Sequence, residues 1–562
     1  MKKQILFFAT TCMAGLSVYG QDASAIDAYR FSQPDLKGTA RFMSMGGAFG
    51  ALGGDLSTLS QNPAGIGVYR SNEIGFTLDL DFQNASSTSQ GVKTGVNQTK
   101  FLLNNLGGVA TLRLPSSTVP NLNLGFTYNK GASFNRRYQG VIPRLNISMS
   151  NYIAGTANNN GLTVADVESS DNFNAYNPND GGLQAPWLTI LGYDGYLINP
   201  NGDPNDPYWT GQWGEASTVD GVTNPATSGS GYFDVIEKGS VDEYNIAIGG
   251  NIANKVYWGM NFDIINFDYR LQSLWGENLE NAWVYNESTG NVGQTTSQWN
   301  MQNLYRANGS GFNYQLGVIV KPIQELRLGL AFHTPTWYNL TQTYSADILG
   351  SYYGKDYNPM TNNGTPGYCD VNLRTPWKVI ASAAAVIGSK LIVSADYEWQ
   401  AYQHMKLSEP TYNDYYYDYY AIPGSPFNPD IYAETNQDIK DYYKQTNTLR
   451  VGAEYRVTPK FSVRAGYSFV SSPVTSKAKE NQIPVYTVGT VTDYRFDNET
   501  NYITCGLGYR FSGFYVDLAY VYKHMTSEYH AFSPDPTSNI RTPQASVSLN
   551  NSQLVLSCGL KF

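Results

Sequence analysis

Few residues in this sequence have the types and spacing that catalysis requires. The four histidines, His333, His404, His524 and His530, all fall at the ends of predicted strands or in loops. A serine hydrolase would need a Ser–His pair, often with its serine in a Gly-x-Ser-x-Gly turn, and the sequence contains no such turn. We therefore expect no enzymatic activity and assign no catalytic residue.

Metal and cofactor sites also lack sequence support. Cys369, Cys505 and Cys558 form an odd, sparse set without CxxC spacing, which argues against a disulfide framework or a structural zinc site. Asn199 to Asp206 offers oxygen ligands that suit calcium, but it matches a calcium loop only loosely, and its Asn-Pro and Gly-Asp pairs are more typical of an ordinary turn. The sequence predicts neither a metal nor a cofactor.

A glycine-rich stretch from Ser44 to Asp55 could be taken for a phosphate-binding loop. No Gly-Lys-Ser/Thr follows it, so that interpretation is rejected. Its glycines would permit tight turns and close backbone approach in a confined space. The segment Gln61 to Gly67 comes next, in which Asn62-Pro63 and Gly65 predict a turn.

The composition is unusual for a soluble globular protein. Charged residues make up 15% of the chain, against about 25% in typical globular proteins, while 14% is aromatic, with 44 tyrosines and 54 glycines. This mixture fits a wall with one face toward lipid and one toward water. The net charge of −9 makes nucleic acid an unexpected partner.

The N-terminus predicts export. Lys2 and Lys3 precede an apolar run from Ile5 to Val18 that ends in small residues near Gly20, so residues 1–20 are predicted to be a secretory signal and Gln21 the mature start. No later stretch approaches the roughly 18 consecutive apolar residues of a membrane helix. A helical membrane protein is therefore not expected.

Strict alternation of apolar and polar residues is the main evidence for the fold class. Near the C-terminus, one face carries Leu554, Leu556, Cys558, Leu560 and Phe562. Near residue 74, one face carries Ile74, Phe76, Leu78, Leu80 and Phe82, and the other carries Glu73, Gly75, Thr77, Asp79 and Asp81. Such strands suit a barrel wall between lipid and lumen, and a terminal Phe562 resembles the signal that barrel assembly machinery reads.

The sequence predicts an all-β fold, an antiparallel transmembrane β-barrel of about 14 strands over residues 71–562. Six connections are short, and seven are long, at about 83–105, 131–242, 271–310, 333–376, 400–447, 470–501 and 523–546. Bacterial barrels have short periplasmic turns and long extracellular loops, so we expect both termini in the periplasm. A soluble sandwich or propeller would not show this division of loop lengths.

Residues 21–70 precede the first strand and are predicted to plug the lumen as a hatch. The Asn62-Pro63-Ala64-Gly65 turn, the glycine-rich stretch before it and the closing hairpins resemble the FadL/TodX (OMPP1-type) family of outer-membrane transporters for long-chain fatty acids and hydrophobic compounds. Those hairpins include Phe461 to Phe469, Leu507 to Phe511 and Val516 to Tyr520. The long loops, including the tyrosine-rich stretch from Tyr412 to Tyr420, resemble the family little.

The resemblance implies passive import across the outer membrane of a Gram-negative bacterium, with long-chain fatty acids as the leading candidate. A hatch containing Asn62, Pro63, Ala64 and Gly65 would move, and the ligand would leave sideways through a gap at an irregular third strand. That strand corresponds to Asn121 to Lys130, whose regular alternation gives no sign of a kink. Arg464, Arg510 and Lys561 have inward parity and could contact a head group, or could simply be solvated charges of the lumen.

Three alternatives remain open. The large loop could capture a partner molecule, with the barrel as an anchor, as in a surface-binding or adhesin-like protein. The barrel could be a porin-like channel for polar solutes, which the predicted plug argues against, or a receptor for haem or another hydrophobic ligand, although no histidine pair is visible. We expect a monomer whose partners are a hydrophobic small molecule, outer-membrane lipids and the barrel assembly machinery.

Overall fold

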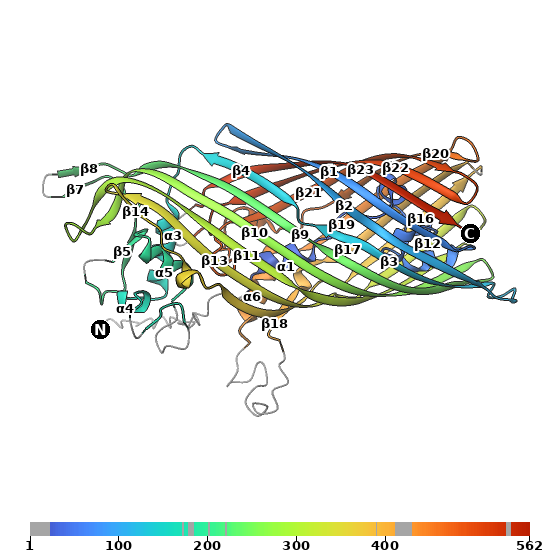
Figure 1. The fold of residues 1–562 in the computed structure, drawn as a ribbon, viewed down its shortest axis with the longest axis horizontal. Helices are drawn as coiled ribbons and strands as arrows, with labels where there is room; N and C mark the ends of the chain where they lie inside the picture. Colours follow the sequence, from blue (N-terminus) through green and yellow to red (C-terminus); the bar gives the residue numbers. More distant parts are fainter. Residues whose placement is uncertain are drawn as a thin grey trace, which may run out of the picture.

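A computed structural model describes residues 23–170, 173–177, 185–200, 203–219, 222–388, 390–410, 430–535 and 541–562. The chain forms a closed antiparallel barrel (Figure 1), as predicted. Fourteen strands form its wall. They are β1 (Glu73–Ser89), β2 (Val92–Arg113), β3 (Asn121–Ser133), β9 (Ser228–Ile252), β10 (Val256–Asn286), β11 (Asn291–Val320), β12 (Leu326–His333), β16 (Lys378–Ile387), β17 (Leu391–Ala401), β19 (Gln445–Arg456), β20 (Phe461–Val470), β21 (Tyr494–Arg510), β22 (Phe514–His530) and β23 (Gln544–Lys561).

The first and last strands close the barrel. β1 pairs with β23 from Glu73 opposite Lys561 to Thr88 opposite Ser546. The remaining wall strands pair with their neighbours in chain order. Closure leaves no free sheet edge where the ladder is continuous, which is the condition for a sheet to stand in lipid.

The two faces of the wall differ as the alternation predicts. On β1 the side chain of Ile74 is 53% exposed and that of Phe76 is 40% exposed, whereas Thr77 and Asp79 are fully buried toward the lumen. Exposed large apolar side chains recur on the outer face of most wall strands. The apolar outer face is the surface that lipid would cover.

Several strands extend far beyond their predicted ends. β10 and β11 pair from Val256 opposite Val320 to Asn286 opposite Asn291, and β9 begins at Ser228, inside the predicted 131–242 loop. Outside lipid both faces of a strand can be polar, so the apolar alternation fades although the hydrogen-bond ladder continues. The ladder is further extended by β4 (Arg136–Ile142), β13 (Trp337–Tyr352), β14 (Lys355–Tyr357), β15 (Gly367–Arg374) and β18 (Lys406–Ser408).

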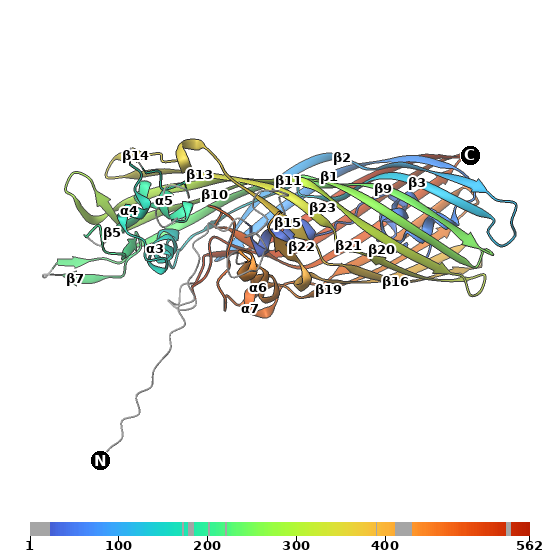
Figure 2. The same ribbon diagram turned by 90° about the horizontal axis from the view of Figure 1, so that it is seen from below.

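The two ends of the barrel are different. The turn end carries the short turns and the C-terminal residue, and the loop end carries the long connections (Figures 1 and 2). The loop-end elements are α3 (Met149–Asn159), α4 (Val164–Val167), α5 (Trp187–Asp194), β5 (Ile198–Pro200), β6 (Trp209–Gly211), β7 (Ser217–Val219), β8 (Val222–Asn224), η3 (Thr361–Gly364), η4 (Tyr402–His404), α6 (Ala433–Tyr442) and α7 (Ser476–Lys479). The Tyr412 to Tyr420 stretch lies outside the described residues.

Residues 23–70, here called the lumenal segment, run inside the barrel (Figures 1 and 2). The segment contains α1 (Ala25–Ser32), α2 (Ala40–Ser44), η1 (Leu56–Ser60) and η2 (Pro63–Val68), and most of its side chains are buried. The predicted signal, residues 1–20, lies outside the described residues. Among the described helices, none has the length and apolar character needed to cross a membrane.

Candidate functional site

The Asn-Pro-Ala-Gly turn is locked by its own asparagine. The Asn62 side chain caps η2 by accepting a hydrogen bond from the Ala64 amide (3.1 Å), and its Nδ2 donates to the Gly50 carbonyl (2.6 Å). Pro63 occupies the first helical position, where a missing N–H costs no hydrogen bond. The four residues therefore tie the end of the lumenal segment to its glycine-rich part.

Wall glycines let this turn approach the sheet at backbone distance. Gly249, Gly259 and Gly317 pair with one another across β9, β10 and β11. A Cβ on Gly259 would lie 2.1 Å from the Pro63 carbonyl oxygen, and one on Gly317 would lie 1.9 Å from Asn62 Oδ1. No side chain other than hydrogen fits these positions while the turn stays in place.

A second glycine contact holds the segment on the opposite part of the wall. Gly452 of β19 pairs with Gly466 of β20. A Cβ on Gly452 would lie 2.4 Å from the Met45 carbonyl oxygen, and a Cβ on Gly466 would lie 2.2 Å from the Met45 carbonyl carbon. Gly46 itself has φ +63°, a conformation that favours glycine. The glycine-rich stretch is thus a docking surface between two backbones.

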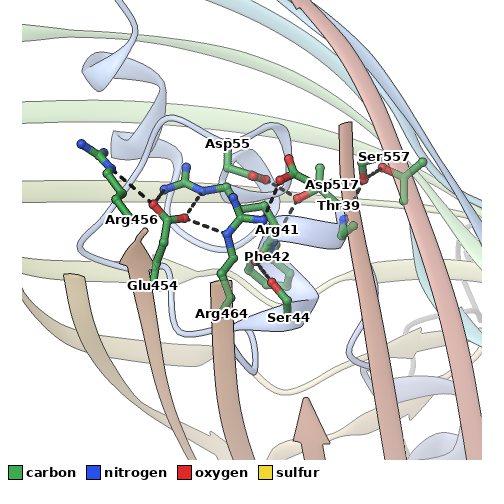
Figure 3. A network of polar contacts seen from close by, with 12 residues as sticks. Thr39, Arg41, Phe42, Ser44, Asp55, Glu454, Arg456, Arg464, Asp517 and Ser557 are labelled. Carbon is green, nitrogen blue, oxygen red and sulfur yellow. Dashed lines mark hydrogen bonds and ion pairs between the residues drawn. The ribbon is translucent and has the colours of Figure 1, made fainter. Parts of the chain in front are cut away.

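Ion pairs add to this packing near the turn end (Figure 3). Arg41 of α2 donates from Nε and Nη2 to the Glu454 carboxylate of β19 (2.8 and 3.3 Å). Arg464 of β20 donates to the same carboxylate (2.8 Å) and to Asp517 of β22 (2.6 Å). Glu454 is therefore shared between the lumenal segment and the wall.

The lumen-facing cations singled out from the sequence lie near the turn end. Arg464 is buried within the Glu454 network, Lys561 is paired with Glu73 (2.8 Å), and Arg510 is exposed. Phe562 is 64% exposed, and its backbone exchanges two hydrogen bonds with Asn72 (2.9 and 3.1 Å). Two cavities lie between the lumenal segment and the wall, and none of these residues lines them. The structure therefore does not bring these residues together as a head-group site.

Two adjoining cavities lie between the lumenal segment and the wall. The first, of about 160 Å³, is bordered by residues 33–37 of the segment and by wall residues that include Asn129, Lys130 and Gly131. The second, of about 90 Å³, shares Gln33, Pro34 and Gly131 with the first. An apolar cavity of about 150 Å³ can hold one benzene molecule, so this space suits a small ligand.

Most charged side chains around the first cavity are already paired. Asp35 pairs with Lys523 (3.0 Å), and Lys37 pairs with Asp79 (2.6 Å) while also donating to Gln553. On the wall, Arg450 pairs with Glu398 (3.1 Å). These contacts attach the segment to β1, β22 and β23, and the cavity they leave is polar as well as aromatic.

The wall ladder is interrupted beside these cavities. β2 and β3 pair only between Asn105 opposite Asn129 and Arg113 opposite Asn121. The remainder of β2, residues 92–104, has a ladder partner only in β1, and β3 shifts register against β9 at Gly131. Asn121 to Lys130 is regular against β9, as its alternation indicates, and the register shift follows at Gly131. The alternation of its apolar residues stays intact because the irregularity begins where they end.

The histidines do not form a site. His333 is buried with a ring nitrogen 2.8 Å from the Gln61 carbonyl oxygen, and His524 contacts Asn550 (2.8 Å). His530 stacks on Tyr494 with ring centroids 4.7 Å apart. In the described ranges, no three His, Cys, Asp or Glu side chains are grouped to hold a metal ion.

Comparison with known proteins agrees with this architecture. Residues 237–557 match the family model described as outer membrane protein transport protein (OMPP1/FadL/TodX). A FadL homologue of Pseudomonas aeruginosa is 12% identical, with 94% of this chain and 99% of that chain covered and a TM-score of 0.51. The likeness supports the fold.

Two toluene transporters are also similar. TodX of Pseudomonas putida and TbuX of Ralstonia pickettii are each 13% identical, with 94% of this chain and 99% of theirs covered and TM-scores of 0.48 and 0.44. No curated protein sequence matches the chain.

Proposed function

Because the chain belongs to the OMPP1/FadL/TodX family of outer-membrane transport proteins, we propose that it passively imports small molecules with a large apolar part. The lumenal segment acts as the hatch, and the ligand passes the cavities beside residues 33–37. It leaves through the interruption between β2 and β3.

The observation that supports this route best is the position of the cavities. They touch both the lumenal segment, at Gln33 and Pro34, and the wall, at Gly131 where β3 shifts register. A ligand there would lie beside Asn129, where the β2–β3 ladder ends and beyond which β2 residues 92–104 have a ladder partner only in β1. Opening an exit in the wall between β2 and β3 would therefore require separating side chains rather than breaking backbone hydrogen bonds of the ladder.

Long-chain fatty acids remain the leading candidate from the sequence, but they need more room than these cavities provide. A space that suits a benzene-sized body cannot hold a long acyl chain unless the hatch moves. Transport of such a chain is therefore expected to depend strictly on hatch movement.

A reversible covalent lock tests the hatch. A Cβ on Gly50 would lie 3.0 Å from Ser382 Cβ of β16, slightly closer than the roughly 3.5–4.5 Å of a disulfide, so a small outward shift lets G50C/S382C in a Cys505→Ser and Cys558→Ser background cross-link. We expect uptake of oleate and toluene into proteoliposomes to stop in the oxidised protein and to return with reductant. Each single-cysteine variant is the control.

Unchanged uptake in the fully cross-linked protein would contradict the hatch role. Absence of uptake for every apolar solute in the reduced and unmodified proteins would contradict import itself. Binding of a fatty-acid chain-length series to the detergent-folded protein then separates acyl ligands from smaller ones.

A further inference from the structure

Two charged side chains of opposite sign face both lumenal cavities. Glu243 lies on β9 and Lys378 is the first residue of β16, and each lines the first and the second cavity. In the part of the chain that the structure describes, neither side chain has a hydrogen-bond partner or an ion pair within 4.0 Å. Both are therefore available to a ligand.

The neighbouring charges behave differently. Those lining the first cavity are paired; besides the pairs already named, Lys130 pairs with Asp242, Arg136 with Glu237 (3.5 Å) and Asp497 with Arg495 (2.9 Å). Among the described residues lining the second cavity, Glu243 and Lys378 are the only Asp, Glu, Lys or Arg. The unpaired charges are thus confined to one acid and one base.

The backbone makes room for the acid. A Cβ on Gly131 would lie 2.6 Å from Glu243 Oε1. The glycine at the register shift of β3 therefore leaves the Glu243 carboxylate the space that a side chain at position 131 would fill. Buried apolar side chains of Phe31, Ile265 and Tyr338 line the second cavity next to these charges. The site therefore offers an anion, a cation and an apolar surface together.

We propose that the two cavities bind a zwitterionic amphiphile of about amino-acid size. Its carboxylate contacts Lys378, its ammonium contacts Glu243, and its apolar body packs against Phe31, Ile265 and Tyr338. Glu243 and Lys378 attract each other without touching, so a zwitterion placed between them gives each charge a direct partner, whereas an unsubstituted hydrocarbon gives neither one. This substrate class rests on the proposed import function and narrows it.

An isosteric ligand series tests the class on the unmodified, detergent-folded protein. L-Phenylalanine, 3-phenylpropanoate, 2-phenylethylamine and ethylbenzene share one apolar body and carry both charges, the anion, the cation or neither. We expect calorimetric affinity to be highest for phenylalanine, about tenfold above either singly charged compound, with ethylbenzene weakest.

Two variants assign the contacts. Lys378→Met should remove the advantage of phenylalanine over phenylethylamine, and Glu243→Gln should remove its advantage over phenylpropanoate. Lys355→Gln, which breaks an exposed pair with Glu287 at the loop end, is the matched control and should leave the ranking unchanged. Heat-modified mobility on gels verifies that each barrel is folded.

Equal or better binding of ethylbenzene would overturn the zwitterion while leaving hydrophobic import intact. Lack of binding by all four compounds would also overturn it, and the disulfide lock then decides separately whether the protein imports apolar solutes. Adding uptake of phenylalanine to that lock assay shows whether the bound ligand is also transported.

Discussion

Arg41 and Glu454 join the lumenal segment to the wall through a two-point ion pair, with Arg41 Nε to Glu454 Oε2 at 2.8 Å and Nη2 to Oε1 at 3.3 Å. The side chain of Glu454 is 1% exposed and that of Arg41 is 14% exposed. Because Glu454 also accepts from Arg464, movement of the segment would leave the wall with a different charge balance.

Removing either partner should loosen the lumenal segment, by different amounts. Arg41→Met leaves Glu454 paired with Arg464, so we expect docking of the lumenal segment to weaken by about 2 kcal/mol, the value of a hydrogen bond to a charged group. Glu454→Gln leaves Arg41 without an acid partner and Arg464 with Asp517 alone, and we expect docking of the segment to weaken by about 3–5 kcal/mol. Urea-dependent proteolysis of residues 23–70 in the folded barrel measures both.

The control for this pair is Arg137→Gln. Arg137 pairs with Asp234 at 2.7 Å, but both side chains are about a third exposed, so the cost should stay below about 1 kcal/mol. A larger effect of Arg41→Met than of Glu454→Gln would show that the shared carboxylate is not the anchor.

Gly317→Ala should displace the Asn-Pro-Ala-Gly turn without unfolding the barrel. The added Cβ would lie 1.9 Å from Asn62 Oδ1 and 2.9 Å from the Ala64 nitrogen, so the turn has to move. We expect faster proteolysis of residues 55–70 and unchanged heat-modified mobility of the barrel. Gly95→Ala, whose Cβ would meet its nearest atom at 3.6 Å, is the matched control, and equal proteolysis of the two variants would refute this role for Gly317.

Substitutions of Asn62 should separate its two hydrogen bonds. Asn62→Ala loses the cap to Ala64 and the bond to the Gly50 carbonyl, whereas Asn62→Asp keeps the acceptor and loses the donor. We expect the alanine variant to weaken docking of the segment by about 1–2 kcal/mol from the cap alone. Urea-dependent proteolysis ranks the two, and identical behaviour of alanine and the native protein would argue against a capped turn.

Docking of α6 at the loop end should weaken as pH rises. Burial first, and then the nearby carboxylates of Asp441 and Glu434, raise the pKa of Asp438 to about 7. The docked helix therefore holds this proton more tightly than the unfolded chain, whose aspartate pKa is about 3.9. The stabilisation is complete below about pH 4 and is lost as pH rises through about 7.

Hydrogen exchange of residues 433–442 measures this effect. After correction for intrinsic rates, we expect less protection at pH 8 than at pH 5 in the native protein. Asp438→Asn, which cannot ionise, should show equal protection at both values. A persistent pH dependence in that variant would assign it to another group.

The fold was largely predictable because lipid imposes a simple rule on the wall. Period-two alternation at Ile74 to Phe82 and Leu554 to Phe562 identified the strands, and the short turns identified their order. Strand ends in the loops were not predictable, since β10 and β11 continue where both faces are polar. Their pairing is decided by the partner strand rather than by local hydrophobicity.

The site was predictable only in part. The Asn62 turn and the glycine-rich stretch stand out in the sequence, and the structure places both inside the barrel. Lumen-facing glycines at Gly259 and Gly317 were an available signal for their docking surface, but they become meaningful only when the pairing register is known. Glu243 and Lys378 carry no sequence signal that distinguishes them from other inward charges.

Alternation, composition and loop lengths therefore determined by themselves that this chain is an outer-membrane barrel preceded by a segment that is not part of the wall. They could do so because each strand shows its lipid-facing side in its own local sequence. Tertiary structure alone decided where the lumenal segment docks, that the ladder is interrupted after Asn129, and which two charges stay unpaired. These features depend on contacts between residues hundreds of positions apart, and their energies are set by distance and burial, which sequence spacing does not encode.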